Sequence, residues 1–181
     1  FRLIADFDSI DENCCAVVNL VNGPTGAVVR AIGGNIVTGN PFSYTVYNNY
    51  RSVNQIDNYG ISLQGDADLG KFTLTSISSA RGVDSFTNQD SDFTSADLIG
   101  TNRNRTNIRT LTHEVRLASN FGGRFEFLIG GYYFNESIDI RADLTFGRDF
   151  RNYAQALSGN GISTVEGLIG VPANTFSQRG Q

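Results

Sequence analysis

Segments in which apolar and polar residues alternate recur along this chain, and the pattern restricts what it can fold into. Tyr59, Ile61 and Leu63 share one parity, whereas Ser62 and Gln64 share the other. A period of two residues is typical of a β-strand with one apolar and one polar face. Because Gly, Thr, Ser, Asn and aromatic residues are abundant and helix formers are few, we expect an all-β fold.

Five strands are predicted, and the connections between them alternate in length. The strands span residues 1–8, 59–66, 71–81, 109–118 and 124–134, with a possible extension of the last over 138–141. The connections 9–57 and 82–108 are long, and the turns 67–70 and 120–123 are short. If consecutive strands reverse direction, the long connections all emerge at one end of the sheet and both turns emerge at the other.

This asymmetry is typical of outer-membrane barrels, which have short periplasmic turns and longer extracellular loops. Predicted strands of about ten residues also match the length that a tilted strand needs to cross a bilayer. We therefore expect an antiparallel up-and-down transmembrane β-barrel segment with long extracellular loops. The barrel is expected to be incomplete, because an odd number of strands cannot close a bacterial barrel.

The composition excludes several classes of protein. The net charge of −4 argues against a nucleic-acid partner, which normally selects a basic face. The longest apolar runs are only a few residues, well short of the roughly 20 that a transmembrane helix needs. The 13 Phe and 7 Tyr residues suit strands. Several of them are expected to form two aromatic girdles, Phe72, Phe125 and Phe127 beside the short turns and Tyr59, Tyr132, Tyr133 and Phe134 beside the long loops.

The two cysteines, Cys14 and Cys15, are neighbours in the chain. Adjacent Cα atoms are about 3.8 Å apart, below the usual disulfide range of about 4.4–6.8 Å. A disulfide between them would be strained, so we expect a loop pair that is free or bonded elsewhere. A metal site is disfavoured because no second Cys or His group lies nearby.

Three stretches resemble the barrel wall of TonB-dependent receptors, above all the sphingomonad-type branch. Residues 112–119, Thr-His-Glu-Val-Arg-Leu-Ala-Ser, resemble the family's Ser-Gln-Glu-Leu-Arg-Leu-x-Ser strand and precede a Gly turn and an aromatic Gly-Gly-Tyr-Tyr-Phe strand. Residues 88–94 are similar to an Asp-x-Asp stretch of an extracellular loop, and residues 4–7 with the Glu-Asn-Cys-Cys opening at 12–15 add support. His113 departs from the pattern, since Gln is usual there.

The resemblance implies that residues 1–181 are part of the barrel domain of a receptor in the bacterial outer membrane. A plug domain, a TonB box and a closing C-terminal strand have no counterparts here, so no coupling residue is carried over. The implied function is active uptake of a scarce ligand, an iron–siderophore or a similar small organic molecule, driven by TonB. The implied partners are TonB, through parts of the protein outside this sequence, the ligand, and outer-membrane lipid. Neither enzymatic activity nor a cofactor is implied.

The first long loop contains the strongest candidate for ligand binding. Phe42, Tyr44, Tyr47, Tyr50 and Arg51 lie close together in the sequence. Flat aromatic rings and a guanidinium group can grip a ring-bearing or iron-chelate ligand. The same rings could equally pack against neighbouring loops.

Charged residues of the predicted strands are given structural roles. Glu114 and Arg116 are assigned to the lumen face, where they would hydrogen-bond across the wall or to a plug, since a charge facing lipid costs about 2–4 kcal/mol. His113 has the opposite parity and is expected to be a wall residue rather than a catalyst.

Charged residues in the second predicted loop, and Arg109 at the start of the strand that follows it, have two interpretations each. Asp90, Asp92 and Asp97 lack the central Gly and distal Glu of a calcium-binding EF-hand loop, so solvated loop acids are the better interpretation. A group of three arginines would either attract anionic ligands and lipopolysaccharide phosphates or keep the loop solvated: Arg103, Arg105 and Arg109.

Three alternatives remain open. A passive porin would use the same alternation but would line its lumen with charged, wetted side chains, whereas Leu128, Tyr132 and Phe134 are expected to face inward. A soluble β-sandwich binding module would dissolve without detergent. An outer-membrane hydrolase would depend on His113, the only histidine.

Overall fold

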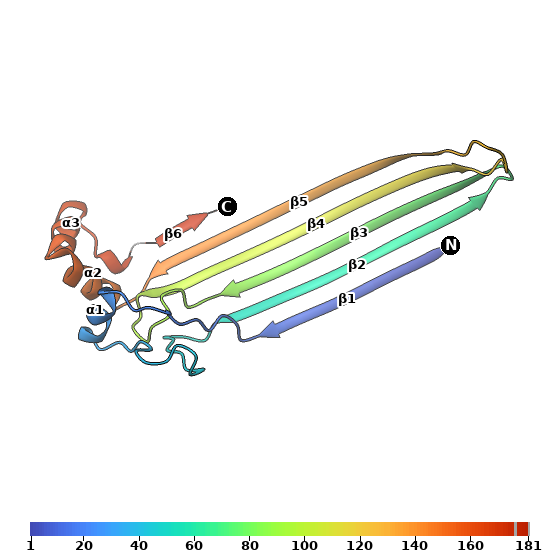
Figure 1. Ribbon diagram of the computed structural model, residues 1–181. Helices are drawn as coiled ribbons and strands as arrows, with labels where there is room; N and C mark the ends of the chain where they lie inside the picture. Colours follow the sequence, from blue (N-terminus) through green and yellow to red (C-terminus); the bar gives the residue numbers. More distant parts are fainter. Residues whose placement is uncertain (176, 181) are drawn as a thin grey trace. The chain divides into compact units, whose positions relative to one another are not determined.

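The computed structural model describes residues 1–175 and 177–180, which form one six-stranded sheet (Figure 1). The strands pair in chain order, β1-β2-β3-β4-β5-β6, as an up-and-down antiparallel sheet. Their bounds are β1 Arg2–Glu12, β2 Val53–Asp68, β3 Phe72–Asn88, β4 Ile99–Ser119, β5 Leu128–Phe146 and β6 Ser177–Gly180. The prediction of an antiparallel, mainly β fold is therefore confirmed.

The strands are longer than predicted. β2 to β5 contain 16, 17, 21 and 19 residues, and most of the predicted loop 82–108 belongs to β3 and β4. The connection between these two strands is only 89–98, and the predicted short turn at 120–123 extends to residue 127. Residues 100–107 have no apolar side chain on either face, so they have no alternation to detect. Their pairing with neighbouring strands makes them a strand, since backbone hydrogen bonds need no apolar side chain.

Helices occur in two of the long connections, and none of them was predicted. α1 (Thr25–Ala31) lies between β1 and β2, whereas α2 (Phe150–Ser158), α3 (Gly161–Ile169) and the 3-10 helix η1 (Ala173–Thr175) follow β5. Gly159 and Gly170 end α2 and α3 in the left-handed region, at φ 56° and 71°. Glycine at this position is a common helix stop, so these two glycines are a sequence signal for the helix ends that was missed.

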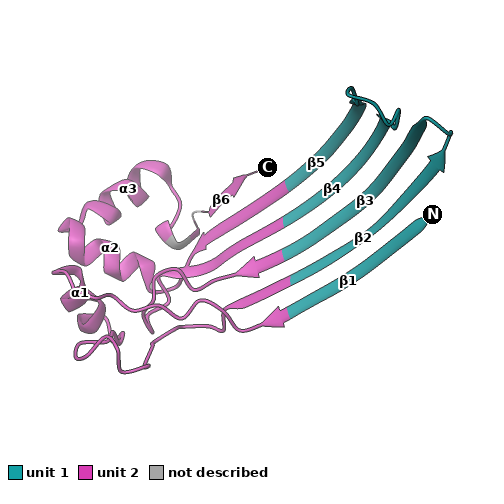
Figure 2. Ribbon diagram, turned by 45° about the vertical axis from the view of Figure 1, so that its right-hand side comes forward, with its two compact units in different colours: residues 1–10, 56–85, 106–139 teal, residues 11–55, 86–105, 140–181 magenta. Residues whose placement is uncertain are grey.

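The chain divides into two compact units, coloured in Figure 2. Unit 1 contains residues 1–10, 56–85 and 106–139, which include both short connections. Unit 2 contains residues 11–55, 86–105 and 140–181, which include the long connections and all helices.

Unit 2 has a small apolar core. Val29 of α1 packs with Ile36, Ala96 and Leu98, which are all buried, and Ile32 and Tyr153 pack around them. Phe146 and Phe150 stack with their ring centroids 3.9 Å apart, so the end of β5 is joined to the start of α2. This core holds the three long connections to one another within the unit.

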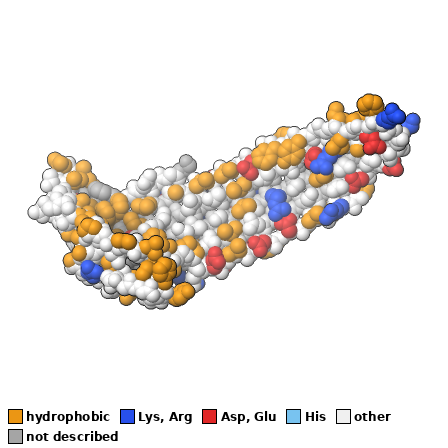
Figure 3. Space-filling model, in the orientation of Figure 1, with side chains coloured by type: hydrophobic (Ala, Val, Ile, Leu, Met, Phe, Trp, Pro, Cys, Tyr) orange, Lys and Arg blue, Asp and Glu red, His pale blue; other side chains and the backbone are white. Residues whose placement is uncertain are grey.

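Unit 1 has an apolar face that nothing in the described residues covers. Its members share one parity on each strand and are exposed, from 37% at Tyr59 to 70% at Phe7. We call this set the apolar face: Leu3, Phe7, Tyr59, Ile61, Leu63 and Leu111. We call the opposite face the polar face, because Thr75 Oγ1 donates to Asp66 there at 2.7 Å and Thr110 Oγ1 donates to Glu136 at 3.0 Å. On β5, Tyr132, Phe134 and Ile138 share the parity of Glu136 and are exposed, so this face also carries apolar side chains. Figure 3 shows one face of the molecule, on which acidic and basic side chains lie among hydrophobic ones.

A glycine on each face of unit 1 lets side chains reach across a strand. On the polar face, Arg81 of β3 passes over Gly60 of β2 and donates to both carboxylate oxygens of Asp6 of β1, at 2.9 and 2.6 Å. On the other face, the Tyr59 ring covers Gly82, where a Cβ atom would lie 2.5 Å from the ring. A larger residue at either glycine would displace the side chain that crosses it.

Aromatic rings gather at the two short connections, but only in part as predicted. Phe72, Phe121 and Phe127 pack together, with ring centroids 5.3 to 6.2 Å apart. Phe125 lies in the same connection and is 87% exposed. Tyr132, Tyr133 and Phe134 were placed beside the long loops; that placement is wrong, because β5 begins at Leu128 and runs to Phe146.

Helices α2 and α3 are joined by an ion pair that acid should break. Arg151 donates to both oxygens of Glu166, at 2.8 to 3.0 Å, and the Ala173 N–H also donates to Glu166. The hydrogen bonds from Arg151 first, then the one from Ala173, hold the pKa of Glu166 below its usual 4.5. A lowered folded-state pKa gives stability that is present above pH 4.5 and is lost as pH falls through the folded value.

We therefore expect the protection of the backbone amides of residues 150–173, corrected for the intrinsic pH dependence of exchange, to fall as the pH drops through the lowered pKa of Glu166. Glu166→Gln should give the same loss of protection already at pH 7, because Gln cannot pair with both guanidinium nitrogens. Hydrogen exchange followed by mass spectrometry measures both effects. Equal protection of this segment in the variant and the parent at pH 7 would contradict the assignment.

Candidate functional site

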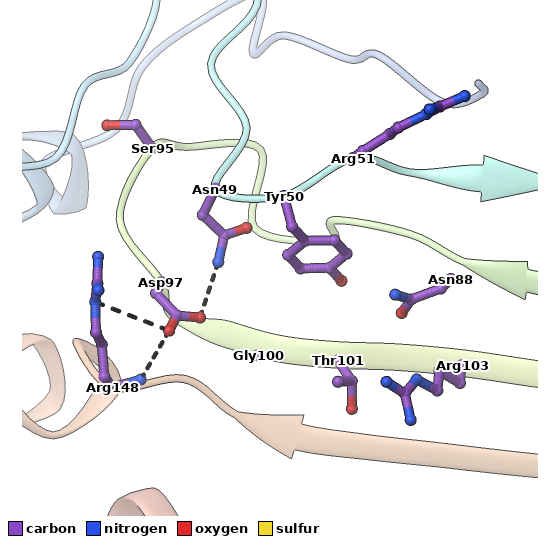
Figure 4. A pocket seen from close by; sticks show the side chains of 10 residues that line it. All are labelled: Asn49, Tyr50, Arg51, Asn88, Ser95, Asp97, Gly100, Thr101, Arg103 and Arg148. Atoms are coloured by element: carbon purple, nitrogen blue, oxygen red, sulfur yellow. Dashed lines mark hydrogen bonds and ion pairs between the residues drawn. The ribbon is translucent and has the colours of Figure 1, made fainter.

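A polar pocket in unit 2 is the candidate functional site (Figure 4). Its volume is about 440 Å³. It is lined by residues of three connections and the ends of two strands, β3 and β4: Asn49, Tyr50, Arg51, Asn88, Ser95, Asp97, Gly100, Thr101, Arg103 and Arg148. Apart from the Tyr50 ring, the lining side chains are polar or charged, so the pocket suits a hydrophilic ligand.

Asp97 joins three segments at one end of the pocket. Its Oδ1 accepts a hydrogen bond from Asn49 Nδ2 at 2.8 Å, and its Oδ2 accepts one from the Arg148 backbone N–H at 3.2 Å. Its backbone N–H donates to Asp149 Oδ2 at 2.9 Å, and its backbone oxygen accepts from the Asp149 N–H. Figure 4 shows the contacts from Asn49 and Arg148 converging on the Asp97 carboxylate. Asp97 therefore holds its neighbours in place and has little acceptor capacity left for a ligand.

The acidic side chains of the 89–98 connection are not the solvated loop acids that the sequence suggested. Asp90 is fully buried and accepts hydrogen bonds from the backbone N–H groups of Asn49 and Asp92. Burial raises the pKa of Asp90 above its usual value. Asp92 accepts four hydrogen bonds, from the Thr94 N–H and hydroxyl and from the N–H groups of Leu98 and Ile99. The 89–98 connection is not paired with a neighbouring strand, so its backbone N–H groups need other acceptors. These carboxylates supply them.

Tyr50 contributes its ring to the pocket, while its hydroxyl is already used. The hydroxyl donates to the Gln89 backbone oxygen at 2.5 Å. Burial first, and then the negative charges of Asp90, Asp92 and Asp97, raise the pKa of Tyr50 to about 12. Tyr50 thus stays protonated, and its ring is held against the 89–98 connection.

The cysteines form a disulfide with each other, Cys14–Cys15, which corrects the expectation that they would not. The backbone accommodates the bond with Cys15 in the left-handed region, at φ 69°. Gln89 Nε2 lies 3.1 Å from Cys15 Sγ and 3.9 Å from Cys14 Sγ. The Gln89 backbone oxygen also accepts from Tyr50, which lines the pocket. Gln89 therefore lies between the disulfide and the pocket wall.

The pocket has three arginines and one acidic residue in its lining. Arg103 was predicted in a loop but lies on β4, as do Arg105, whose guanidinium carbon lies 4.8 Å from the Phe86 ring centroid, and Arg109. Arg148 approaches Asp97 and Asp149 at 4.0 and 3.7 Å. Arg51 Nε donates to Asn13, and Figure 4 shows its side chain extending away from Tyr50 and Asp97.

The structure separates the predicted Tyr-rich cluster. Tyr50 and Arg51 line the polar pocket, whereas Phe42 and Tyr44 line a second pocket of about 330 Å³, together with Ala16, Val18, Pro41, Thr45 and Val46. Tyr44 is fully exposed, and Tyr47 lines neither of these two pockets. Sequence proximity did not bring the rings together, because residues 40–52 follow an irregular path with Tyr44 at φ 56°.

The other predicted residues lie in unit 1. Glu114 and Arg116 bond to each other along β4, where residues two apart share a face, rather than to a neighbouring strand. His113 Nδ1 and Ser78 Oγ are 2.8 Å apart, so the polar edge of the imidazole has a partner on β3. His113 lies on β4, and both its wall role and the assignment of Glu114 and Arg116 to the lumen stay predictions.

Asp92→Ala should disorganise the 89–98 connection, because it leaves the N–H groups of Thr94 and Ile99 without an acceptor. It also removes one of the two acceptors of the Leu98 N–H and of the Thr94 hydroxyl, which both still reach the Ala96 oxygen. Each unpaired buried group costs about 1–3 kcal/mol. Limited proteolysis should then cut within 89–98 much faster than in the parent protein. Ser91→Ala is the matched control, since Ser91 makes fewer contacts in the same connection. Equal cleavage rates for the two variants would count against this role.

No family model, curated protein or solved structure matches the chain. None of the helices among the described residues is both long and apolar enough to cross a membrane. Within residues 1–175 and 177–180, no three His, Cys, Asp or Glu side chains are grouped so that they could hold a metal ion.

Proposed function

We propose that the chain is part of the wall of an outer-membrane β-barrel that takes up a scarce small ligand, driven by TonB. The observation that carries this proposal is the apolar face of unit 1. Large apolar side chains there are exposed and belong to neighbouring antiparallel strands. Exposed apolar patches of this extent mark contact with lipid or another protein. The side chains at the two ends of this patch, along the strand direction, favour lipid.

Aromatic side chains lie at both limits of the apolar face. The Phe72–Phe121–Phe127 group lies at the short connections, and Tyr59 lies over Gly82, about ten residues farther along β3. At about 3.3 Å per residue and a strand tilt of about 40°, ten residues span roughly 25 Å across the membrane. That is the height of the apolar band of outer-membrane barrels, which aromatic girdles flank.

Polar groups on the apolar face support the same upper and lower ends of the proposed lipid-facing band. Asp84 accepts from the Tyr59 hydroxyl at 2.9 Å and from Arg109 at 2.9 and 3.1 Å, and Arg109 lies 5.4 Å from the Tyr59 ring centroid. This paired group would lie at the headgroup level, where charged and amphipathic side chains are favoured. Between the two aromatic limits, the Nδ1 atom of His113 is paired with the Ser78 hydroxyl, which lowers the cost of placing this polar group in the band.

The uptake part of the proposal rests on the resemblance and on unit 2. The stretch at residues 112–119 resembles TonB-dependent receptors, in which long extracellular loops capture the ligand. The long connections of this chain contain the polar pocket, which is large enough for a small molecule. Ligand capture by these connections is therefore the function that the pocket suits best.

Paired spin labels test whether the apolar face meets lipid. Nitroxide labels would be placed at Leu63→Cys on the apolar face and at Gln64→Cys on the polar face of the intact protein in lipid vesicles. We expect the label at 63 to collide with oxygen dissolved in lipid and the label at 64 to collide with a water-soluble nickel chelate. Water accessibility at both positions would contradict the membrane proposal and favour a soluble β-sandwich.

A passive porin is the second candidate, and one observation favours it. The polar face of unit 1 carries ion pairs, Arg81 with Asp6 and Arg116 with Glu114, as an open, wetted lumen would. Planar-bilayer conductance of the intact protein separates the two functions. A transporter closed by a plug should show no steady ion conductance, whereas a porin conducts without any ligand.

A further inference from the structure

Arg103 is the one arginine of the polar pocket with no partner in the part of the chain that the structure describes. It lies on β4, between the polar pocket and a second cavity of about 310 Å³. The acidic residue of that cavity, Asp143, is paired instead with Arg179 at 3.2 Å. Arg103 is exposed, and its planar guanidinium presents five N–H donors that match a carboxylate or a phosphate.

The charge around Arg103 favours an anion as well. Arg148 is 80% exposed, and its contacts with Asp97 and Asp149 are long for ion pairs, at 4.0 and 3.7 Å. The single acidic residue of the lining, Asp97, has both carboxylate oxygens occupied by donors of the protein. An incoming anion would therefore meet two guanidinium groups that have donors to spare. It would need both of them, because Asp97 keeps its negative charge while it accepts from neutral donors.

Asn49 suggests that the ligand also carries a hydrogen-bond donor. Its Oδ1 atom is buried and has no hydrogen-bond partner among the described residues. Figure 4 shows the amide nitrogen turned toward Asp97 and the oxygen turned toward Tyr50. A buried acceptor without a donor is unfavourable, and a hydroxyl group of a ligand would supply the missing donor.

We propose that the polar pocket binds a small anion that also carries a hydroxyl group, a hydroxylated carboxylate or phosphate. Arg103 and Arg148 would bind the anionic groups, and Asn49 Oδ1 would accept from the hydroxyl. Flat aromatic ligands fit this pocket poorly, because Tyr50 is its only ring and the other lining side chains are hydrophilic. The proposal deepens the proposed function, since it names the chemistry of the captured ligand.

Calorimetric titration of the intact protein in detergent tests the proposal with defined probes. Malate and succinate differ only in one hydroxyl group, and glycerol 3-phosphate replaces the carboxylates by a phosphate. We expect saturable binding of malate at least several-fold tighter than that of succinate. Tighter binding of glycerol 3-phosphate than of malate would assign the natural ligand to the phosphates, and the reverse order would assign it to the carboxylates.

Two variants with the same loss of charge locate the site. Arg103→Gln should weaken malate binding about tenfold or more, whereas Arg105→Gln, two residues farther along β4 and stacked on Phe86, should leave it unchanged. Equal affinities for malate and succinate, equal effects of the two variants, or no saturable binding of any probe at millimolar concentration would each overturn the proposal.

The spin-label experiment separates this inference from the proposed function. If the label at Leu63 is in lipid and no probe binds, only the ligand assignment fails. If malate binds and the label at Leu63 is in water, the pocket is an anion site in a protein that does not span the outer membrane.

Discussion

Leu63→Arg should prevent much of the protein from assembling in the outer membrane. Leu63 lies on the apolar face of β2, near the middle of the stretch between Asp68 at the turn and Tyr59. At mid-membrane an arginine that faces lipid costs about 2–4 kcal/mol, which corresponds to a roughly 30- to 900-fold shift between folded and unfolded protein. The folded fraction in outer-membrane preparations, followed by urea titration, measures the effect.

Gln64→Arg is the matched control for this experiment. Gln64 is the next residue of β2, and its side chain lies on the polar face, where its amide donates to Asp66 at 3.0 to 3.2 Å. An arginine there meets an acidic neighbour instead of lipid, so a change within about 1 kcal/mol is expected. If the protein tolerates arginine equally well at both positions, the apolar face does not meet lipid.

Gly147→Ala should disrupt the polar pocket more than any other single-methyl change in unit 2. The Gly147 N–H donates to the Leu98 oxygen at 2.8 Å, and a Cβ atom at Gly147 would overlap the backbone oxygen and the carboxylate of Asp97. A backbone group cannot rotate out of the way as a long side chain can. The 89–98 connection would therefore have to move, and overpacking of this kind costs about 1–3 kcal/mol or more.

Hydrogen exchange of residues 89–98 measures the effect without reference to any ligand. We expect markedly faster exchange in Gly147→Ala, and weaker binding of any ligand that the pocket holds, because Asp97 positions both Asn49 and Arg148. Gly39→Ala is the control, since nothing lies within 4 Å of a Cβ atom placed there. Unchanged exchange in Gly147→Ala would show that the contact between Gly147 and the 89–98 connection is not tight.

Several features of the fold could be predicted from local sequence alone. The faces of β2 follow from the alternation at residues 59–64, because the direction of a strand side chain depends only on its parity. The turn after Asp68 was also placed correctly, and the Asp68 carboxylate accepts from the Gly70 N–H at 2.8 Å, as a short turn requires. The antiparallel order of the strands then follows from short connections between neighbours.

The extent of the strands and the site could not be predicted in this way. β4 begins at Ile99 because its polar first half pairs with neighbouring strands. No local sequence pattern predicts that pairing. In the pocket, Asp97 contacts Asn49 and Arg148, which are 48 and 51 positions away in the chain. The buried carboxylate of Asp90 looked like a solvated acid for the same reason, since its acceptors serve backbone groups of a distant segment.

Sequence therefore determined which side chains face the same way, and where the chain turns, because both properties depend on neighbouring residues only. Tertiary structure decided which of the polar residues meet. Arg51 and Arg103 looked alike in the sequence, yet one is bonded to Asn13 and the other is left to face a cavity. That difference depends on contacts between segments that are tens of residues apart in the chain. Such contacts form only after the strands have paired and brought the segments together.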